Sequence, residues 1–232
     1  MPGAPRWHNQ AMSTPPASPA APAAPSGPAP YPVDLDVRYP DQPRNRATAF
    51  FRLILAVPVL ILLGMLTQQT STDLSAANAA SLAGGFVFLP TLLLLLFRHR
   101  YPRWWFDFNV QLLAFLNRVS MYLLLLRDEY PSTEDRQALD LRVPYPDAKA
   151  ELSRGLPLVK WLLAVPHYIV LGVLSIGVLV AVVIAWFAIL FSGRCPRGIH
   201  DFIVGYLRWT ARVYCYAILL TTDRYPPFRL AS

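Results

Sequence analysis

Residues 157–192 carry a single charged side chain, Lys160, which lies near the start of the stretch. A transmembrane helix needs about 20 residues to cross a hydrocarbon core that is about 30 Å thick. The stretch is therefore too long for one span and has the length of two. Gly172, Ser175 and Gly177 offer a place for the chain to turn, because glycine and serine favour turns. We predict a transmembrane helical hairpin over these residues.

A second pair of apolar segments precedes this stretch, Ala47–Leu66 and Ala83–Phe97, joined by the polar residues 67–81. The whole chain is 54% hydrophobic and only 15% charged, whereas soluble domains are about 25% charged. This balance excludes a compact soluble enzyme of uniform composition. We predict an all-α membrane protein with four spans arranged as two hairpins.

The net charge is +7, and many of the basic side chains flank the two predicted hairpins, whose loops contain no Lys or Arg. Because positive charge beside a span stays on the cytoplasmic side, both termini and the segment between the hairpins are predicted to be cytoplasmic. The basic excess then indicates anionic lipid headgroups as the partner, and no nucleic acid. The flanking residues are Arg44, Arg46, Arg52, Arg98, Arg100, Arg103, Lys149, Arg154, Lys160, Arg194 and Arg197.

The N-terminal residues 1–32 are rich in proline and alanine and have no periodic apolar face. Such a composition favours extended polyproline conformations, so we predict a disordered cytoplasmic tail, either a spacer or a ligand for a proline-binding module. The tail lacks the apolar stretch of a secretory signal, and the first apolar segment is expected to be an uncleaved anchor. Cys195 and Cys215 fall on the predicted cytoplasmic side, where thiols stay reduced.

The chain after the tail contains an internal duplication, in which short motifs recur in the same order. Tyr-Pro-Asp at 39–41 recurs at 145–147, and Leu-Ala-Val-Pro at 55–58 recurs at 163–166. We therefore predict a first membrane repeat at 33–131, a linker at 132–140 and a second membrane repeat at 141–228. Later matches pair Tyr101-Pro102-Arg103 with Cys195-Pro196-Arg197, and Arg127-Asp128-Glu129-Tyr130-Pro131 with Thr222-Asp223-Arg224-Tyr225-Pro226.

Each repeat ends in a further helix, Trp104–Leu126 in the first and Ile199–Leu220 in the second. A narrow polar stripe on an otherwise apolar helix is typical of a helix that lies in the cytoplasmic interface. The alternative makes both helices spans and gives six crossings, but it places one of two matching basic turns outside. The stripes consist of Asp107, Gln111 and Arg118 in the first helix, and of Asp201, Gly205, Arg208 and Arg212 in the second.

Pro58 and Pro166 are predicted to kink the first helix of each hairpin. His167 follows Pro166, and an ionisable side chain inside a membrane is a functional-site candidate by default, for proton transfer or substrate binding. The alternative is structural: a neutral His167 bonds a carbonyl group freed by Pro166. The matching position of the first repeat is Val59, so only one copy carries the imidazole.

The charged side chains of the two further helices are the other candidates. Asp107 and Arg118 are about 16 Å apart along one helix at 1.5 Å per residue, so they cannot pair within one repeat. We predict that Asp107 pairs with Arg212, and Asp201 with Arg118, across a pseudo-two-fold axis. The alternative is a headgroup or anion site formed by Arg118, Arg208 and Arg212.

No cofactor or metal centre is predicted. The four histidines have no ligand spacing, and the chain lacks HExxH and CxxC motifs. Cys195, His200 and Asp201 form a nominal Cys/His/Asp set, but their spacing does not impose catalytic geometry. We therefore expect no catalytic residues.

The segment Phe187–Phe228 contains Phe-Ser-Gly-Arg-Cys-Pro-Arg-Gly, then Asp-Phe, an arginine-bearing helix and Asp-Arg-Tyr-Pro-Pro-Phe, and Ala-Val-Pro-His stands at 164–167. This pattern resembles an uncharacterised family of bacterial membrane proteins, domain of unknown function 4389. The resemblance covers 157–228, and the first repeat resembles a degenerate copy. It implies an integral protein of the bacterial cytoplasmic (inner) membrane and implies no activity.

Three functions compete. The first is a non-catalytic accessory or scaffold protein, with a membrane-protein partner or a homo-oligomer. The second is a small transporter or channel that uses the surface between the repeats and His167, since internal repeats and broken helices are typical of transporters. The third is a protein that binds or handles lipid.

Overall fold

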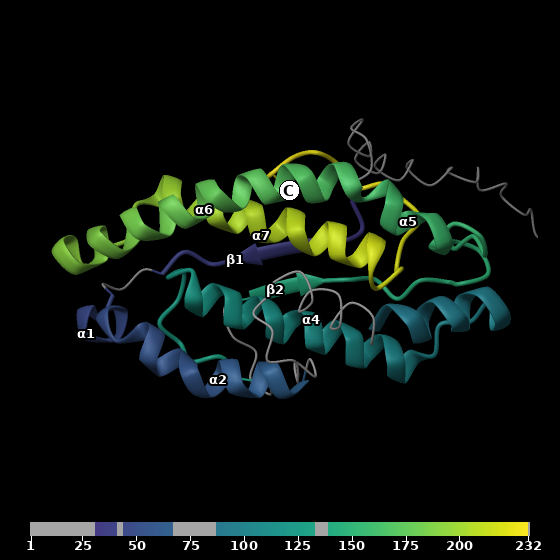
Figure 1. Cartoon of the computed structure of the whole chain (residues 1–232), viewed down its shortest axis with the longest axis horizontal. Helices are drawn as coiled ribbons and strands as arrows, with labels where there is room; N and C mark the ends of the chain where they lie inside the picture. Colours follow the sequence, from purple (N-terminus) through teal and green to yellow (C-terminus); the bar gives the residue numbers. More distant parts are fainter. Residues whose placement is uncertain (1–30, 41–43, 67–86, 133–138, 232) are drawn as a thin grey trace, which may run out of the picture.

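The structure is a computed structural model of the chain, and it describes residues 31–40, 44–66, 87–132 and 139–231 (Figure 1). Nearly all of the predicted tail lies outside these residues, as do the predicted loop 67–81 and most of the linker. The described part is mostly helical, which confirms the predicted fold class in outline. It also contains a small β-sheet that the sequence did not predict.

The longest element is the helical segment Pro157–Ser192, built from α5 (Pro157–Leu163) and α6 (Val165–Ser192). Among the described residues it alone is long and apolar enough to cross a membrane, judged by length and composition. Only 22% of the most apolar 18-residue stretch of this segment is buried inside the chain, whereas the core helix of a soluble domain is mostly buried.

The predicted hairpin within this segment is wrong, because α6 continues without interruption past Gly172 and Gly177. A glycine inside a helix costs only about 1 kcal/mol relative to alanine. On the same stretch Val178 and Ala181 pack into the core against α7 (Arg197–Ala217). The packing of one helix face therefore outweighs the local signal for a turn, and the predicted total of four spans is not supported.

The two prolines that were predicted to kink helices occupy different positions. Pro58 lies inside α2 (Arg52–Leu66), as predicted. Pro166 lies in the first turn of α6, where its missing N–H would have no intrahelical acceptor. Pro166 thus stands beside Ala164, where the helical segment Pro157–Ser192 divides into α5 and α6. The break falls where the kink was predicted, and His167 lies in the same first turn.

The first half of the chain forms shorter helices near the predicted apolar segments. α1 (Arg46–Phe50) precedes α2, and a helical segment follows at Val87–Arg98, whose last turn is the π-helix η1 (Leu94–Arg98). Asn45 caps α1 by accepting hydrogen bonds from the N–H groups of Ala47 and Thr48 at 3.0 and 3.5 Å, which satisfies donors that lack an intrahelical partner.

The two further helices form as predicted, as α4 (Arg103–Leu123) and α7. Each starts directly after a proline, Pro102 or Pro196. Each is followed by a leucine in the left-handed region, Leu125 with φ 61° and Leu220 with φ 57°. These leucines turn the chain sharply, so that the residues after each helix fold back toward it.

The β-sheet consists of two antiparallel strands, β1 (Asp34–Val37) and β2 (Leu139–Arg142), with Leu35 opposite Leu141 and Asp36 opposite Asp140. In both strands apolar and charged residues alternate, which is the pattern of a strand with one buried face. Four residues are too short a run to stand out in an apolar chain, and this explains why the sheet was not predicted.

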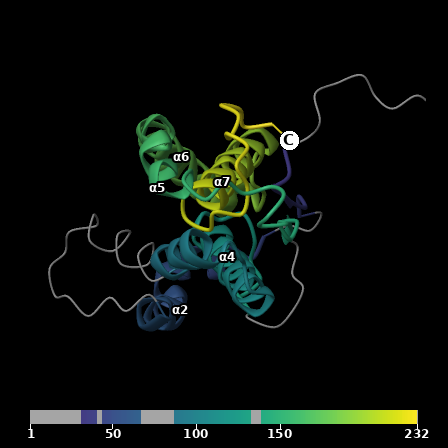
Figure 2. The ribbon, with the colours of Figure 1, turned by 90° about the vertical axis from the view of Figure 1, so that its right-hand side faces the viewer.

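The elements form three layers when viewed along the long axis (Figure 2). α6 and α2 lie on one side, the sheet lies on the opposite side, and α4 and α7 lie between them. β1 packs on α7 and β2 packs on α4. The largest core cluster joins β1, α6 and α7 through Leu35, Val37, Val178, Ile203 and Leu207.

Candidate functional site

His167 is completely buried in the first turn of α6, at a place where three parts of the chain meet. Trp209 of α7 donates its Nε1–H to the Nδ1 of His167 at 3.1 Å. The ring of Phe228, from the segment that follows α7, stacks on the imidazole with centroids 3.9 Å apart and planes at 16°. The ring of Tyr225 lies 4.8 Å from the imidazole on the same segment. We call these four residues the His167 cluster.

The hydrogen bond from Trp209 fixes the tautomer of the imidazole. An indole N–H can only donate, so Nδ1 of His167 must accept and the neutral ring carries its proton on Nε2. Nε2 is buried and has no hydrogen-bond partner among the described residues. The arrangement thus offers one unsatisfied donor beside aromatic rings, and the carbonyl bond expected from Pro166 is absent from the described contacts.

Lys160 of α5 forms a second buried contact beside the His167 cluster. Its Nζ lies 2.7 Å from Oδ1 of Asp223 and donates to the carbonyl of Thr222 at 2.8 Å. The ammonium also lies 5.3 Å from the ring centroid of Tyr216, where a cation is attracted by the ring. The lone charge of the apolar stretch is therefore neutralised by the segment that follows α7.

Arg208 and Arg212 of α7 hold β1 and the C-terminal segment. Arg208 donates to the carbonyls of Leu35 and Leu230 and to Asp36, at 2.7, 3.1 and 3.0 Å. Arg212 lies 3.6 Å from Oδ1 of Asp34. It also donates to the carbonyl groups of Val33 and Ala231, at 3.4 and 2.9 Å. Burial lowers the pKa of Arg212, and Asp34 opposes that shift.

These contacts bring the recurring sequence motifs of the second half together: the Ala-Val-Pro-His motif meets the closing Asp-Arg-Tyr-Pro-Pro-Phe motif through His167 and Phe228. Residues 157–229 match the family model of a domain of unknown function, DUF4389. The match confirms the resemblance found in the sequence. No curated protein and no solved structure matches the chain.

The DUF4389 segment contains every residue of the His167 cluster as well as Lys160 and Asp223. It excludes β1, which supplies the carboxylates that face Arg208 and Arg212. The fold of the DUF4389 segment is thus completed by residues of the first half of the chain.

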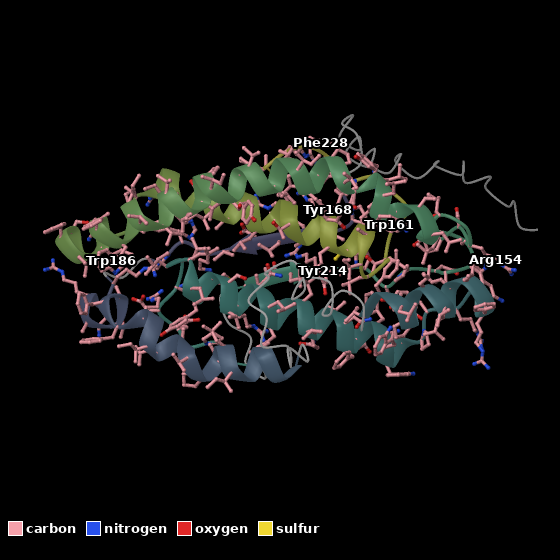
Figure 3. The ribbon with its side chains drawn as sticks, in the orientation of Figure 1. Arg154, Trp161, Tyr168, Trp186, Tyr214 and Phe228 are labelled. Carbon is pink, nitrogen blue, oxygen red and sulfur yellow. The ribbon has the colours of Figure 1, made fainter. Side chains whose placement is uncertain are left out.

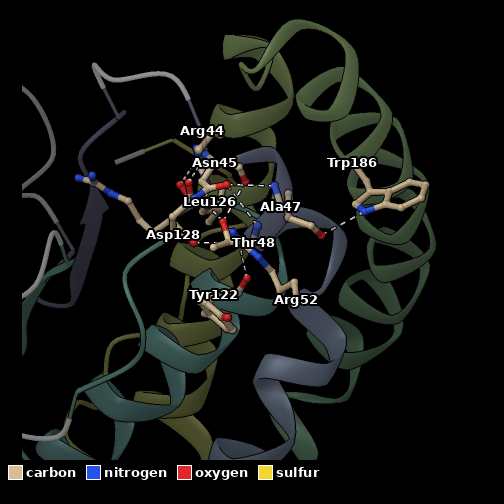
Figure 4. A network of polar contacts seen from close by, with 11 residues as sticks. Arg44, Asn45, Ala47, Thr48, Arg52, Tyr122, Leu126, Asp128 and Trp186 are labelled. Carbon is tan, nitrogen blue, oxygen red and sulfur yellow. Dashed lines mark hydrogen bonds and ion pairs between the residues drawn. The ribbon is translucent and has the colours of Figure 1, made fainter.

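A network in the first half resembles the Lys160 contact (Figure 4). Asp128 pairs with Arg44 at 3.3 Å and with Arg52, and it accepts a hydrogen bond from the N–H of Asn45 at 3.2 Å. Arg52 also lies over the ring of Tyr122, 4.7 Å from its centroid. Arg52 and Lys160 each stand three residues before a Leu-Ala-Val-Pro motif, so the two cations occupy matching positions.

The predicted charge pairs across the repeats do not form. Asp107 and Asp201 are exposed on α4 and α7, and Asp201 lies 3.3 Å from the neighbouring His200. Arg118 donates to the carbonyl of Ser132 at 2.9 Å. The predicted pairs are absent because both carboxylates lie on outward faces of their helices, whereas Arg212 faces β1, a strand that the sequence did not predict. The alternative headgroup site is weakened as well, since the chain's own oxygens bind these guanidinium groups.

Cys195, His200 and Asp201 are close in sequence but are not set up for nucleophilic chemistry. Burial raises the pKa of the Cys195 thiol and lowers the pKa of His200. Both shifts favour the neutral forms, so a thiolate–imidazolium pair is disfavoured. Within the described residues no three His, Cys, Asp or Glu side chains form a group that could hold a metal ion.

The sequence missed Asp223 and Asp128 as partners of buried cations. A usable signal existed, because a lone cation in an apolar stretch needs a counter-charge. Lys160 is such a cation, and Asp223 lies in a motif that recurs around Asp128. The role of Asp34 had no comparable signal, since it precedes the predicted helices.

Proposed function

We propose that this chain is a non-catalytic membrane accessory or scaffold protein, anchored by the apolar side of α5 and α6. One observation carries the proposal. The long helical segment exposes large apolar side chains over its whole length, while the ionisable side chains on its inner side, Lys160 and His167, are completely buried. An exposed apolar surface of this extent marks contact with a membrane or another protein.

The charged groups inside the fold support a structural role over a catalytic one. Arg52, Lys160 and Arg212 are all bound by carboxylates and carbonyl groups of the same chain. A group that binds a solute or drives a reaction needs free donors or a perturbed acid and base. In this fold the buried cations hold segments of the chain together, and their donors are used for these contacts and not for binding a solute.

We further propose that the chain is a tandem of two related units, and matched contacts support this. The hydroxyl of Tyr39 donates to the carbonyl of Cys195 at 2.6 Å, and that of Tyr145 donates to the carbonyl of Tyr101. In the predicted duplication Tyr39 matches Tyr145, and Cys195 matches Tyr101. The lead-in of each unit thus binds the basic turn of the other, as expected for two units related by a pseudo-two-fold axis.

Native purification tests the accessory role. The tagged chain would be extracted in polymer nanodiscs, with residues 1–32 and without them, and the co-purifying proteins would be quantified. An accessory subunit should retain a protein partner in fixed stoichiometry, and His167→Val, which introduces the residue found at position 59, should keep that partner. A monomer or homo-oligomer that purifies with a specific lipid or solute and without a protein partner would overturn the proposal.

The alternative is a small transporter, channel or lipid-binding protein, and the unpartnered Nε2 of His167 favours it. A bound solute or lipid oxygen could accept the proton of that buried donor. In this case the purified chain should carry a specific lipid or solute, and His167→Val should lose it while the protein stays folded. Mass spectrometry of the extracted nanodiscs distinguishes the two outcomes.

A further inference from the structure

We infer, resting on the membrane attachment proposed above, that the chain lies in the plane of the membrane: the exposed sides of α2, α5 and α6 are buried in one leaflet, and the β1–β2 sheet lies in water. α2 lies on the same side of the molecule as α5 and α6, and the sheet lies on the opposite side (Figure 2). The exposed apolar residues of α2 and α6 include Ile54, Ile61, Ile169, Ile176, Ile184 and Phe191.

The position of the sheet argues against an upright, spanning orientation. α6 runs parallel to the long axis of the molecule, and the sheet lies near the middle of that axis (Figure 1). Its side chains Arg142 and Asp140 form a pair with 76% and 59% of their surfaces exposed. An upright α6 would carry this charged pair into the hydrocarbon core, where charged side chains are costly.

The length of the apolar segment also argues against a spanning orientation. α6 has 28 residues and is about 42 Å long at 1.5 Å per residue, whereas the hydrocarbon core is about 30 Å thick. α5 extends the apolar segment to 36 residues. A helix in the plane of the membrane faces no such limit, because it needs only one apolar side along its length.

The basic side chains lie at both ends of the long axis. Trp186, near the end of α6, marks one end, and Arg154 marks the other (Figure 3). Arg46 and Arg194 are exposed near the Trp186 end, since Arg46 donates to the carbonyl of Phe191. At the opposite end the Nε2 of His99 lies 2.7 Å from the carbonyl of Leu152.

That contact brings the basic turn after the segment Val87–Arg98 to the Arg154 end, where Arg98, Arg100 and Arg154 are exposed. If α6 crossed the bilayer, one basic end of the molecule would lie on the outer side of the membrane, against the positive-inside rule. Lying flat, both ends reach the headgroups of the same leaflet, and anionic headgroups match their charge.

Nitroxide labels along α6 test this orientation. Single cysteines would replace Ile169, Ile176, Ile184 and Phe191, with Asp140→Cys as the control on the sheet. The full chain would be reconstituted in vesicles of phosphatidylcholine with a minority of phosphatidylglycerol. Oxygen, which enters the bilayer, and a water-soluble nickel complex then report the depth of each label. The native Cys195 and Cys215 are buried, so the unmutated chain should take up little label.

In-plane binding predicts that all four α6 labels have the same depth within a few ångströms and that the label at 140 is in water. A spanning helix predicts a depth that passes through the bilayer centre between Ile169 and Phe191, and this result would overturn the inference while leaving membrane anchoring intact. Labels that stay in water, with no vesicle binding, would overturn the proposed function too. Labels shielded from both reagents, with spin coupling between copies, would assign the surface to a second chain and overturn the inference.

Discussion

The Nζ atom of Lys160 and the Oδ1 atom of Asp223 are 2.7 Å apart, and this pair ties the start of the apolar helical segment to the residues that follow α7. The side chain of Lys160 is completely buried, and that of Asp223 is 18% exposed. The closing segment that carries Tyr225 and Phe228 therefore begins at an ion pair and continues onto His167.

Lys160→Met should destabilise the fold by about 3 kcal/mol, because removal of one member of a buried pair leaves the other without its counter-charge. Chemical unfolding in detergent micelles measures the change. Lys149→Met is the matched control, since Lys149 is exposed and its replacement should change stability by less than about 0.5 kcal/mol. Partial recovery in the double variant Lys160→Met with Asp223→Leu is expected. Equal stabilities of K160M and K149M would contradict the role of the pair.

Arg212→Met should cost about 3 kcal/mol, because it removes the charged donor of the Val33 and Ala231 carbonyl groups and leaves Asp34 with Arg208 as its remaining guanidinium partner. Arg118 occupies the matching position of α4, but it donates to the carbonyl of Ser132 and not to a strand. Arg118→Met should therefore cost only about 1 kcal/mol. Hydrogen exchange of β1 provides a second measurement, and it should accelerate in R212M alone. Identical exchange in both variants would show that Arg212 does not hold β1.

Gly205→Ala should loosen the C-terminal segment. A Cβ atom at Gly205 would meet the Cβ of Leu230 at 2.8 Å and its carbonyl oxygen at 3.1 Å, so backbone must move. We expect a loss of about 1–2 kcal/mol, as for other overpacked sites. At Gly172 nothing lies within 4 Å, and Gly172→Ala should stabilise the unbroken α6 by about 0.5–1 kcal/mol. Thermal unfolding would reveal the opposite signs, and destabilisation by G172A would favour a turn there.

Stability should fall at alkaline pH. Burial raises the pKa of Cys215, Tyr101 and Tyr214 to about 12. In the unfolded chain these groups titrate near 9.0 for Cys and 10.0 for Tyr. The folded state thus keeps protons that the unfolded state releases, and the free energy of unfolding is fully retained below about pH 9 and decreases from there toward about pH 12.

Unfolding temperatures measured from neutral pH upward would check this decrease. Tyr214→Phe removes one of the three groups, so the decline should be shallower in that variant while its stability at neutral pH is little changed. A stability that stays constant through this range would contradict the burial of these groups.

Local patterns located most of the helices. The apolar stretches mark α2, the segment Val87–Arg98 and α5–α6, and the prolines at 102 and 196 mark the starts of α4 and α7. These features depend on residues a few positions apart, so the sequence reports them directly. The Ala-Val-Pro-His and Asp-Arg-Tyr-Pro-Pro-Phe motifs also pointed to the domain of unknown function whose family model matches residues 157–229.

The hairpin at Gly172–Gly177 failed as a prediction because a local turn signal competes with tertiary packing. Two glycines weaken a helix by only about 1 kcal/mol each, and the face of α6 that packs on α7 contributes more than that. Sequence alone cannot weigh the two terms, since the second depends on where α7 lies.

The sequence by itself determined that this chain has long apolar helices, basic flanks and a repeated set of motifs. Only the tertiary structure decided that α6 is unbroken, that Arg212 faces Asp34, and that Lys160 meets Asp223. The physical reason is range: helix formation follows from neighbours along the chain, whereas a buried charge is satisfied by whichever oxygen the fold brings to it. For Arg212 that oxygen lies on a strand at the other end of the sequence.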